Sequence, residues 1–118
     1  SISPPAGIVP YTVRKLLESE QFPKMKLLCG EKGLDREVKG IRIIEIEDME
    51  QYLTGGEMLK PAFRYIYHAV TEVEQHFEDL VKSDISGFIV KKREEDDPTG
   101  KRLKLLEKHC EKYEIPLV

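Results

Sequence analysis

Four charged residues are the strongest candidates for a binding role in this 118-residue chain. They stand beside glycine-containing turns or near the end of an apolar run: Asp35, Arg36, Glu45 and Glu57. A guanidinium beside carboxylates forms strong charge-assisted hydrogen bonds, which suit the binding of a polar metabolite. We therefore expect these side chains to build a ligand-binding or partner-binding surface. The alternative is a structural clasp, in which Asp35 caps turn amides and Arg36 reaches the carboxylate of Glu45.

Two glycine-containing turns accompany these residues. In the opening turn, Gly30 and Gly33 can adopt positive φ, while Leu34 is expected to fill the core. In the second turn, which comes directly before Glu57, Gly55 and Gly56 can also adopt positive φ. Ligands of open α/β sheets bind beyond the carboxyl ends of the strands, and we expect the second turn to lie at such a cleft. The structural residues of the two turns are Gly30, Gly33, Leu34, Val38, Gly55 and Gly56.

The chain lacks the common signatures of catalysis and of metal binding. It has no glycine-rich phosphate loop, no paired-cysteine metal motif and no nucleophile elbow. On a helix, His68, Glu72 and His76 would share one face, but the rise per residue puts the two histidines about 12 Å apart, too far for one ion. We expect no catalytic residue, no metal and no cofactor.

The two cysteines are also expected to be structural. Cys29 follows Leu27 and Leu28, which favours burial over the electropositive, open site that a reactive thiolate needs. Cys110 falls at the core spacing of a helix. Two cysteines do not make a disulfide framework, so a reduced, cytoplasmic setting fits the chain best.

The apolar periods predict the elements that position these residues. Thr12 is expected to cap a short first helix. Residues 38–48 have apolar side chains on both faces, so this strand should be covered on both sides. The other predicted elements are a strand at 25–30, helical turns at 47–53 capped by Asp48, a short strand from Glu57, a helix from Thr71 that ends at Ser83 and Asp84, a strand at 85–92, a last helix capped by Asp97, and a final apolar segment at 115–118.

Helices and strands thus alternate through the second half of the chain, while residues 61–70 fit a strand or a helix equally well. Alternation with right-handed crossovers predicts an α/β fold. We expect a single compact domain at residues 12–118, with helices packed on a mainly parallel or mixed sheet. Residues 1–11 are expected to form a flexible tail.

The composition limits the classes of partner. Forty per cent of the residues are hydrophobic and 35% are charged, which is typical of a soluble globular protein. No apolar run has the length of a membrane span, so we expect no membrane contact. The net charge of −3 offers no field that attracts phosphate backbones, so this segment is not expected to bind nucleic acid directly.

The stretch "GEKGLDREVKGIRIIEIEDMEQYLTGGEML" resembles the N-terminal domain of the PucR-type bacterial transcription regulators, named after a regulator of purine catabolism. The family motif has a Leu-Leu pair, a Gly-x-x-Gly-Leu-Asp-Arg-x-Val segment, an apolar strand ending in Glu, and Gly-Gly-Glu-Leu. This chain supplies Leu16 and Leu17; Gly30, Gly33, Leu34, Asp35, Arg36 and Val38; Glu45; and Gly55, Gly56, Glu57 and Met58. The closing "EKYEIPLV" also resembles the family, so the resemblance covers about residues 12 to 118.

The resemblance implies a regulatory domain, with DNA contacts made by a helix-turn-helix located further along the full-length protein. It also implies a small-molecule effector of purine or ureide type, and we expect a homo-oligomer in the full-length protein. One departure is that Leu59 is followed by Lys60, Pro61, Ala62 and Phe63 where the family has a Leu-Thr-Thr-Gly-like loop. The alternatives are a purely structural dimerisation module and a small enzyme that uses acidic residues near Gly56.

Overall fold

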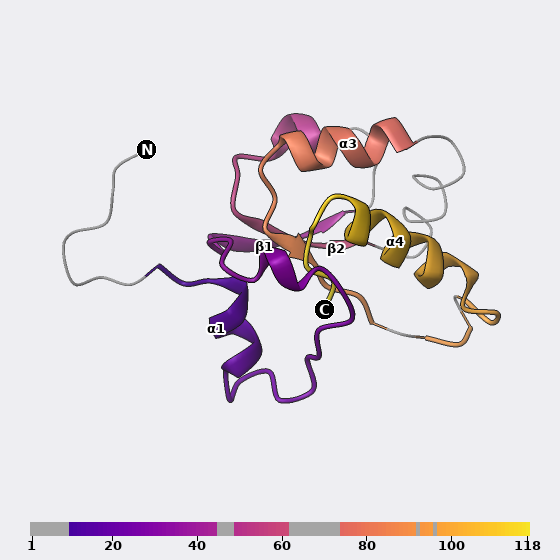
Figure 1. The fold of residues 1–118 in the computed structure, drawn as a ribbon, viewed down its shortest axis with the longest axis horizontal. Helices are drawn as coiled ribbons and strands as arrows, with labels where there is room; N and C mark the ends of the chain where they lie inside the picture. Colours follow the sequence, from indigo (N-terminus) through magenta and orange to yellow (C-terminus); the bar gives the residue numbers. More distant parts are fainter. Residues whose placement is uncertain (1–9, 45–48, 62–73, 92, 96) are drawn as a thin grey trace.

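The computed structural model describes residues 10–44, 49–61, 74–91, 93–95 and 97–118 (Figure 1). Their elements in chain order are α1 (Val13–Glu18), the short 3-10 helix η1 (Glu31–Gly33), β1 (Gly40–Ile44), the 3-10 helix η2 (Met49–Tyr52), β2 (Glu57–Pro61), α3 (Glu74–Lys82), β3 (Gly87–Phe88) and α4 (Lys101–Lys112). The strands form one parallel sheet in the order β1-β2-β3. The prediction of a compact α/β domain with a mainly parallel sheet is confirmed.

The C-terminal segment continues this sheet beyond β3. Leu117 forms a parallel bridge with Phe88 and an antiparallel bridge with Cys29. The amide of Leu117 donates to the carbonyl of Cys29 at 2.9 Å, and the amide of Val118 donates to that of Phe88 at 2.9 Å. The expectation that the final apolar segment joins the sheet is therefore confirmed. The strand expected at residues 25–30 is reduced to the single bridge at Cys29.

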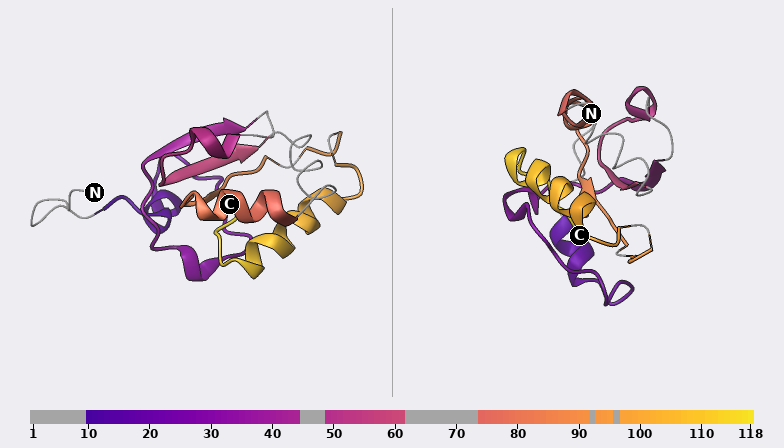
Figure 2. Two further views of the ribbon diagram at one scale, coloured as in Figure 1. Left: turned by 90° about the horizontal axis from the view of Figure 1, so that it is seen from above. Right: turned by 90° about the vertical axis from the view of Figure 1, so that its right-hand side faces the viewer.

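Helices cover the sheet from both sides. Leu59 and Phe88 point into a core with α3 and α4, whereas Met58 and Ile89 point into a second core with Val13 of α1. Neighbouring residues of a strand face opposite sides of a sheet, so the two cores lie on opposite faces. In the larger core α3 and α4 pack against each other (Figure 2). There the rings of Phe77 and Tyr113 lie 5.5 Å apart, and the Tyr113 hydroxyl donates to Glu78 at 2.8 Å.

The helix ends show which capping predictions were right. The Thr12 hydroxyl accepts a hydrogen bond from the amide of Lys15 at 3.3 Å, so the predicted cap of α1 is confirmed. Asp97 is not the N-cap of α4, because Gly100, at φ 72°, occupies that position. Its carboxylate nevertheless accepts from the amides of Arg102 and Leu103 at 3.2 and 3.1 Å. Asp97 therefore caps the helix from one turn further away.

Strand β1 departs from the expectation that both its faces are covered. Ile44 is buried on one face of the strand, whereas Ile41 and Ile43, on the other face, are 50% and 60% exposed. Arg42 donates from Nη1 to the carbonyl of Tyr52 at 2.9 Å and so ties the strand to η2. Among the described strands, β1 lies at the edge of the sheet, and α1 covers the sheet face only nearer to β2 and β3.

Several predictions fall on residues outside the described ranges. They concern Glu45, Asp48, His68, Glu72, the segment 62–70 and residues 1–9 of the expected tail. Among the helices that the structure describes, none combines the length and the hydropathy that crossing a membrane would require.

Candidate functional site

The opening turn lies against the C-terminal segment of the chain. Gly30 has a φ of 81°, and a Cβ placed there would lie 2.1 Å from the carbonyl oxygen of Ile115. A Cβ at Gly33 would lie 2.5 Å from the carbonyl oxygen of Glu114. The prediction of positive φ is confirmed at Gly30 and wrong at Gly33, where the close approach of another backbone excludes a side chain instead.

The apolar residues of this turn anchor it to the smaller core. Leu34 and Val38 are half-buried and pack against the cluster that contains Val13 and Leu16. The amide of Val38 also donates to the carbonyl of Tyr11 at 2.6 Å. The turn is therefore held from two sides, by α1 and by the C-terminal segment, and its backbone has a defined position.

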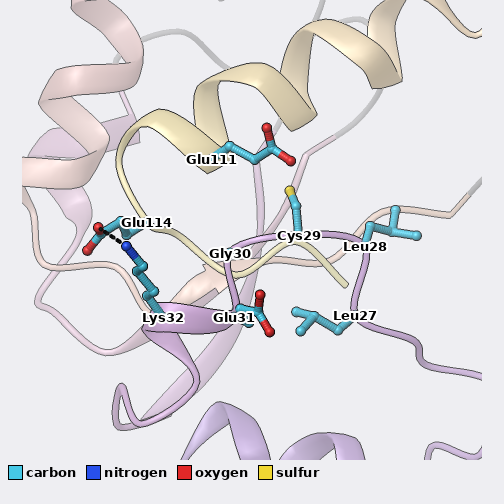
Figure 3. Close-up of a pocket in the computed structure, with 8 residues that line it drawn as sticks. All are labelled: Leu27, Leu28, Cys29, Gly30, Glu31, Lys32, Glu111 and Glu114. Carbon is cyan, nitrogen blue, oxygen red and sulfur yellow. Dashed lines mark ion pairs between the residues drawn. The ribbon is translucent and has the colours of Figure 1, made fainter.

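A hollow of about 440 Å³ opens between this turn and the C-terminal end of α4 (Figure 3). We call it the acidic hollow. Three carboxylates and one amine line it, together with the thiol of Cys29 and the backbone of Gly30: Glu31, Glu111, Glu114 and Lys32. Lys32 pairs with Glu114 at 3.6 Å. Within the described ranges, neither Glu31 nor Glu111 forms an ion pair, so both carboxylates are available to a ligand.

The acidic hollow holds Cys29 in its protonated form. Burial and the neighbouring carboxylates of Glu111 and Glu107 raise the pKa of this thiol to about 11. Its Sγ also donates to the carbonyl of Glu107 at 3.7 Å. The thiol is therefore neutral at pH 7. Burial of this apolar run was expected, but Cys29 is only half-buried and Leu28 is 47% exposed.

Arg36 is the predicted site residue that the structure places in a cavity of its own. The cavity measures about 110 Å³ and is also lined by Lys39, Gly56 and Asp84. Arg36 donates from Nη1 to the carbonyl of Ile85 at 3.4 Å, while its buried Nε has no hydrogen-bond partner within the described ranges. Small-molecule sites usually measure about 300–1,000 Å³, so this cavity suits a few waters better than a metabolite.

Glu57 and Asp35 do not face this cavity. Glu57 is buried, and its carboxylate accepts from the amides of Thr54 and Gly55 at 2.8 and 2.7 Å, which closes the second glycine turn. Asp35 is exposed and pairs with Arg14 of α1 at 3.3 Å. Glu45, the partner expected for Arg36, lies outside the described residues. The described members of the predicted set therefore do not converge on one ligand site.

The second glycine turn also lies at the opposite end of the sheet from the one expected. Gly55 and Gly56 have φ of 102° and 80°, as predicted, and they precede β2 rather than follow it. The amide of Lys39 donates to the carbonyl of Gly56 at 2.7 Å, and the amide of Gly56 donates to that of Asp84 at 2.8 Å. The turn thus links the amino ends of the three parallel strands.

The carboxylates of the acidic hollow were missed by sequence reasoning. Glu31 lies in the opening turn that the motif had singled out, but Glu111 and Glu114 lie about eighty residues further along. They join the turn only because the segment 115–118 pairs with Cys29. In the part of the chain that the structure describes, no cluster of three or more His, Cys, Asp or Glu side chains is arranged to hold a metal ion.

A comparison with protein-family models matches residues 15–118 to the purine catabolism regulatory protein-like family, PucR. The chain belongs to this family. The match includes the opening turn, all three strands and α4, and it confirms the resemblance drawn from the motifs. Family membership indicates a regulatory domain of a transcription regulator. No curated protein and no solved structure matches the chain.

Proposed function

We propose that this PucR-family domain is the sensory domain of a cytoplasmic bacterial transcription regulator, and that it binds a small N–H-rich metabolite in the acidic hollow. DNA binding would belong to a helix-turn-helix elsewhere in the full-length protein. The observation that carries this proposal is a hollow of about 440 Å³ that presents the carboxylates of Glu31 and Glu111, neither of which pairs with another side chain among the residues that the structure describes. Its volume falls within the usual range of about 300–1,000 Å³ for small-molecule sites.

The chemistry of the lining selects the class of metabolite. An ionised carboxylate only accepts hydrogen bonds and can take two neighbouring N–H groups at once. Neutral purines such as hypoxanthine, and neutral ureides such as allantoin, offer such N–H groups. Three carboxylates against the single amine of Lys32 leave a formal charge of −2 in the lining, so anions such as urate and allantoate are disfavoured.

Sensing also requires that the ligand distinguish two arrangements of the protein. The acidic hollow is built from two segments far apart in the chain, the opening turn and the end of α4. A ligand that bridges Glu31 and Glu111 stabilises the arrangement in which these segments are close. The coupling to the DNA-binding domain would then follow from the position of α4 and of the C-terminal segment.

Calorimetric titration tests the proposal with hypoxanthine, allantoin, urate and allantoate. We expect one neutral compound to bind with one site per chain, and Glu111→Gln to weaken that binding by about tenfold, since a hydrogen bond to a charged group contributes about 1.5 kcal/mol or more. Glu18→Gln is the matched control, because Glu18 is an exposed carboxylate of α1 outside the hollow. Absence of binding by all four compounds would contradict the purine or ureide class of effector.

A second candidate function is assembly, and the exposed Ile41 and Ile43 on edge strand β1 favour it. Exposed apolar edge strands pair readily with other chains. On this basis we propose that the full-length protein is a homo-oligomer that uses β1. Light scattering after size exclusion should show a dimer that Ile43→Lys dissociates, whereas Leu105→Lys, at a 40% exposed position of α4, leaves it intact. A wild-type monomer at high concentration would rule this candidate out.

A further inference from the structure

A larger and mainly apolar groove, of about 730 Å³, lies next to the acidic hollow, with which it shares Leu28 in the lining. The loop that follows α1 forms one wall, and the beginning of α4 forms another. Ile89 and Val118 are buried at its base, and the half-buried side chains of Phe22, Met25 and Val90 add to the apolar lining. The groove is thus large enough for a small molecule and is chemically unlike the acidic hollow.

Three lysines surround this apolar lining: Lys24, Lys26 and Lys91. All three are exposed, and within the described part of the chain none of them forms an ion pair. Among the described side chains of the lining, Glu107 is the one carboxylate, so the three amines and this carboxylate give these side chains a formal charge of +2. A protein of net charge −3 therefore carries a locally positive rim around an apolar groove.

The groove also has the position in the fold that favours ligand binding. Residues 89–91 directly follow β3, so the groove lies beyond the carboxyl end of that strand. The amide of Val90 donates to the carbonyl of Val118 at 3.0 Å, which fixes the base of the groove to the sheet. Ligands of open α/β sheets bind at this end of the strands, where sequence analysis had wrongly placed the Gly55–Gly56 turn.

We propose that this groove is a binding site for an amphipathic monocarboxylate with an alkyl chain of about eight to ten carbons, the size class that small-molecule grooves of this volume accept. The alkyl chain lies on Ile89, Val90 and Val118, and the carboxylate is held at the rim by the lysines. The apolar lining stabilises each buried methylene, and the positive rim selects the anion over a cation of the same length. Apart from Leu28, the residues of this site do not line the acidic hollow, so either proposal can fail alone.

A ligand series that keeps the alkyl chain and changes the head group tests the role of charge. Decanoate, decanol and decyltrimethylammonium are titrated by calorimetry below their micelle-forming concentrations, together with octanoate. We expect decanoate to bind with one site per chain, tighter than decanol, and decyltrimethylammonium to bind most weakly. Octanoate should bind about fifteenfold more weakly than decanoate, because it lacks two methylenes and each buried methylene contributes about fourfold in affinity.

Variants then separate the rim from the base of the groove. The triple variant Lys24→Gln, Lys26→Gln, Lys91→Gln should lower decanoate affinity by about tenfold and leave decanol unchanged. Met25→Gln, at a half-buried position that lines the groove and not the acidic hollow, should weaken both ligands. Lys82→Gln on α3 is the control for the loss of one surface amine, and it should change the affinity for neither decanoate nor decanol.

Three outcomes would overturn the proposal. The first is the absence of saturable decanoate binding to the wild-type protein when circular dichroism shows that it is folded. The second is equal affinity for decanoate, decanol and decyltrimethylammonium, which would show that the lysine rim does not select the ligand. The third is decanoate binding that neither the triple lysine variant nor Met25→Gln weakens, which would place the ligand outside the groove.

Discussion

Replacing Gly30 with alanine should destabilise the domain far more than a glycine-to-alanine change normally does. The new Cβ would lie 2.1 Å from the carbonyl oxygen and 2.4 Å from the carbonyl carbon of Ile115, and both are backbone atoms that cannot rotate away. Placing a residue with a side chain in the left-handed backbone at φ of 81° lowers the free energy of unfolding by about 1 kcal/mol. Overpacking against the backbone adds about 2–3 kcal/mol, so we expect a total of about 3–4 kcal/mol.

Gly100→Ala is the matched control for this change. Gly100 also has a left-handed backbone, with φ of 72°, but no atom lies within 4 Å of its Cβ position. Its substitution should therefore lower the free energy of unfolding only by the cost of the left-handed backbone, about 1 kcal/mol. The difference between the two variants isolates the contact between the opening turn and Ile115.

Urea unfolding followed by circular dichroism measures both free energies of unfolding. With a slope of about 1.5 kcal/mol per molar urea, Gly30→Ala should lower the midpoint by about 2 M, and Gly100→Ala by less than about 1 M. Equal midpoints for the two variants would refute the close packing of the opening turn on the C-terminal segment. The geometry of the acidic hollow would then have no support, because that packing brings Glu31 and Glu111 together.

Three further predictions concern individual contacts. Glu57→Gln should lower the free energy of unfolding by about 1–2 kcal/mol, because the carboxylate accepts from two turn amides; an unchanged urea midpoint would contradict this. Asp35→Asn should change it by less than about 0.5 kcal/mol, because the ion pair with Arg14 is exposed; a larger loss in the same assay would show that the pair is structural. With its pKa raised to about 11, Cys29 should react with iodoacetamide at pH 8 about tenfold more slowly than an unperturbed thiol. Its thiolate fraction at pH 8 is roughly a hundredfold smaller, and the higher nucleophilicity of a thiolate of high pKa offsets part of this loss. The rate should rise as the pH approaches 11, because the thiolate fraction grows. Buried Cys110 should stay unmodified in the folded protein, and peptide mass mapping reads both sites.

The features that were predicted correctly depend on neighbouring residues. The hydroxyl of Thr12 caps α1 from three residues away, and the φ values of Gly55 and Gly56 follow from the turn that they form. The parallel sheet follows from the alternation of helices and strands. The cap and the turn can be inferred from short stretches of sequence, because the interactions that produce them are local, whereas the sheet is inferred from the order of the elements along the chain.

One of the features that were missed is a local contact of Glu57, and the other two depend on how distant segments pack. A glutamate that follows two glycines looks available to a ligand, yet Glu57 folds back on the amides of Thr54 and Gly55. The alternation of Ile41 and Ile43 with Arg42 and Ile44 predicts two apolar faces, but it does not show that the helices leave one face of this edge strand exposed. The pairing of Leu117 with Cys29, which builds the acidic hollow, has no local signal.

The end of the sheet at which a turn lies is a further property that local patterns do not reveal. The Gly55–Gly56 turn has the composition of a binding loop, but it connects η2 to the amino end of β2. The carboxyl end of β3 is instead occupied by residues 89–91 and the apolar groove. The Gly55–Gly56 turn and the apolar groove therefore lie at opposite ends of the parallel strands.

The most direct test of the proposed sensory role is an NMR titration of the ¹⁵N-labelled protein with hypoxanthine and allantoin. The proposal predicts saturable shifts of the amides of Glu31, Lys32 and Glu111 with one of these compounds, and their loss in Glu111→Gln. If a compound binds and these amides do not move, or if neither compound shifts them at saturating concentration, the acidic hollow is not the effector site.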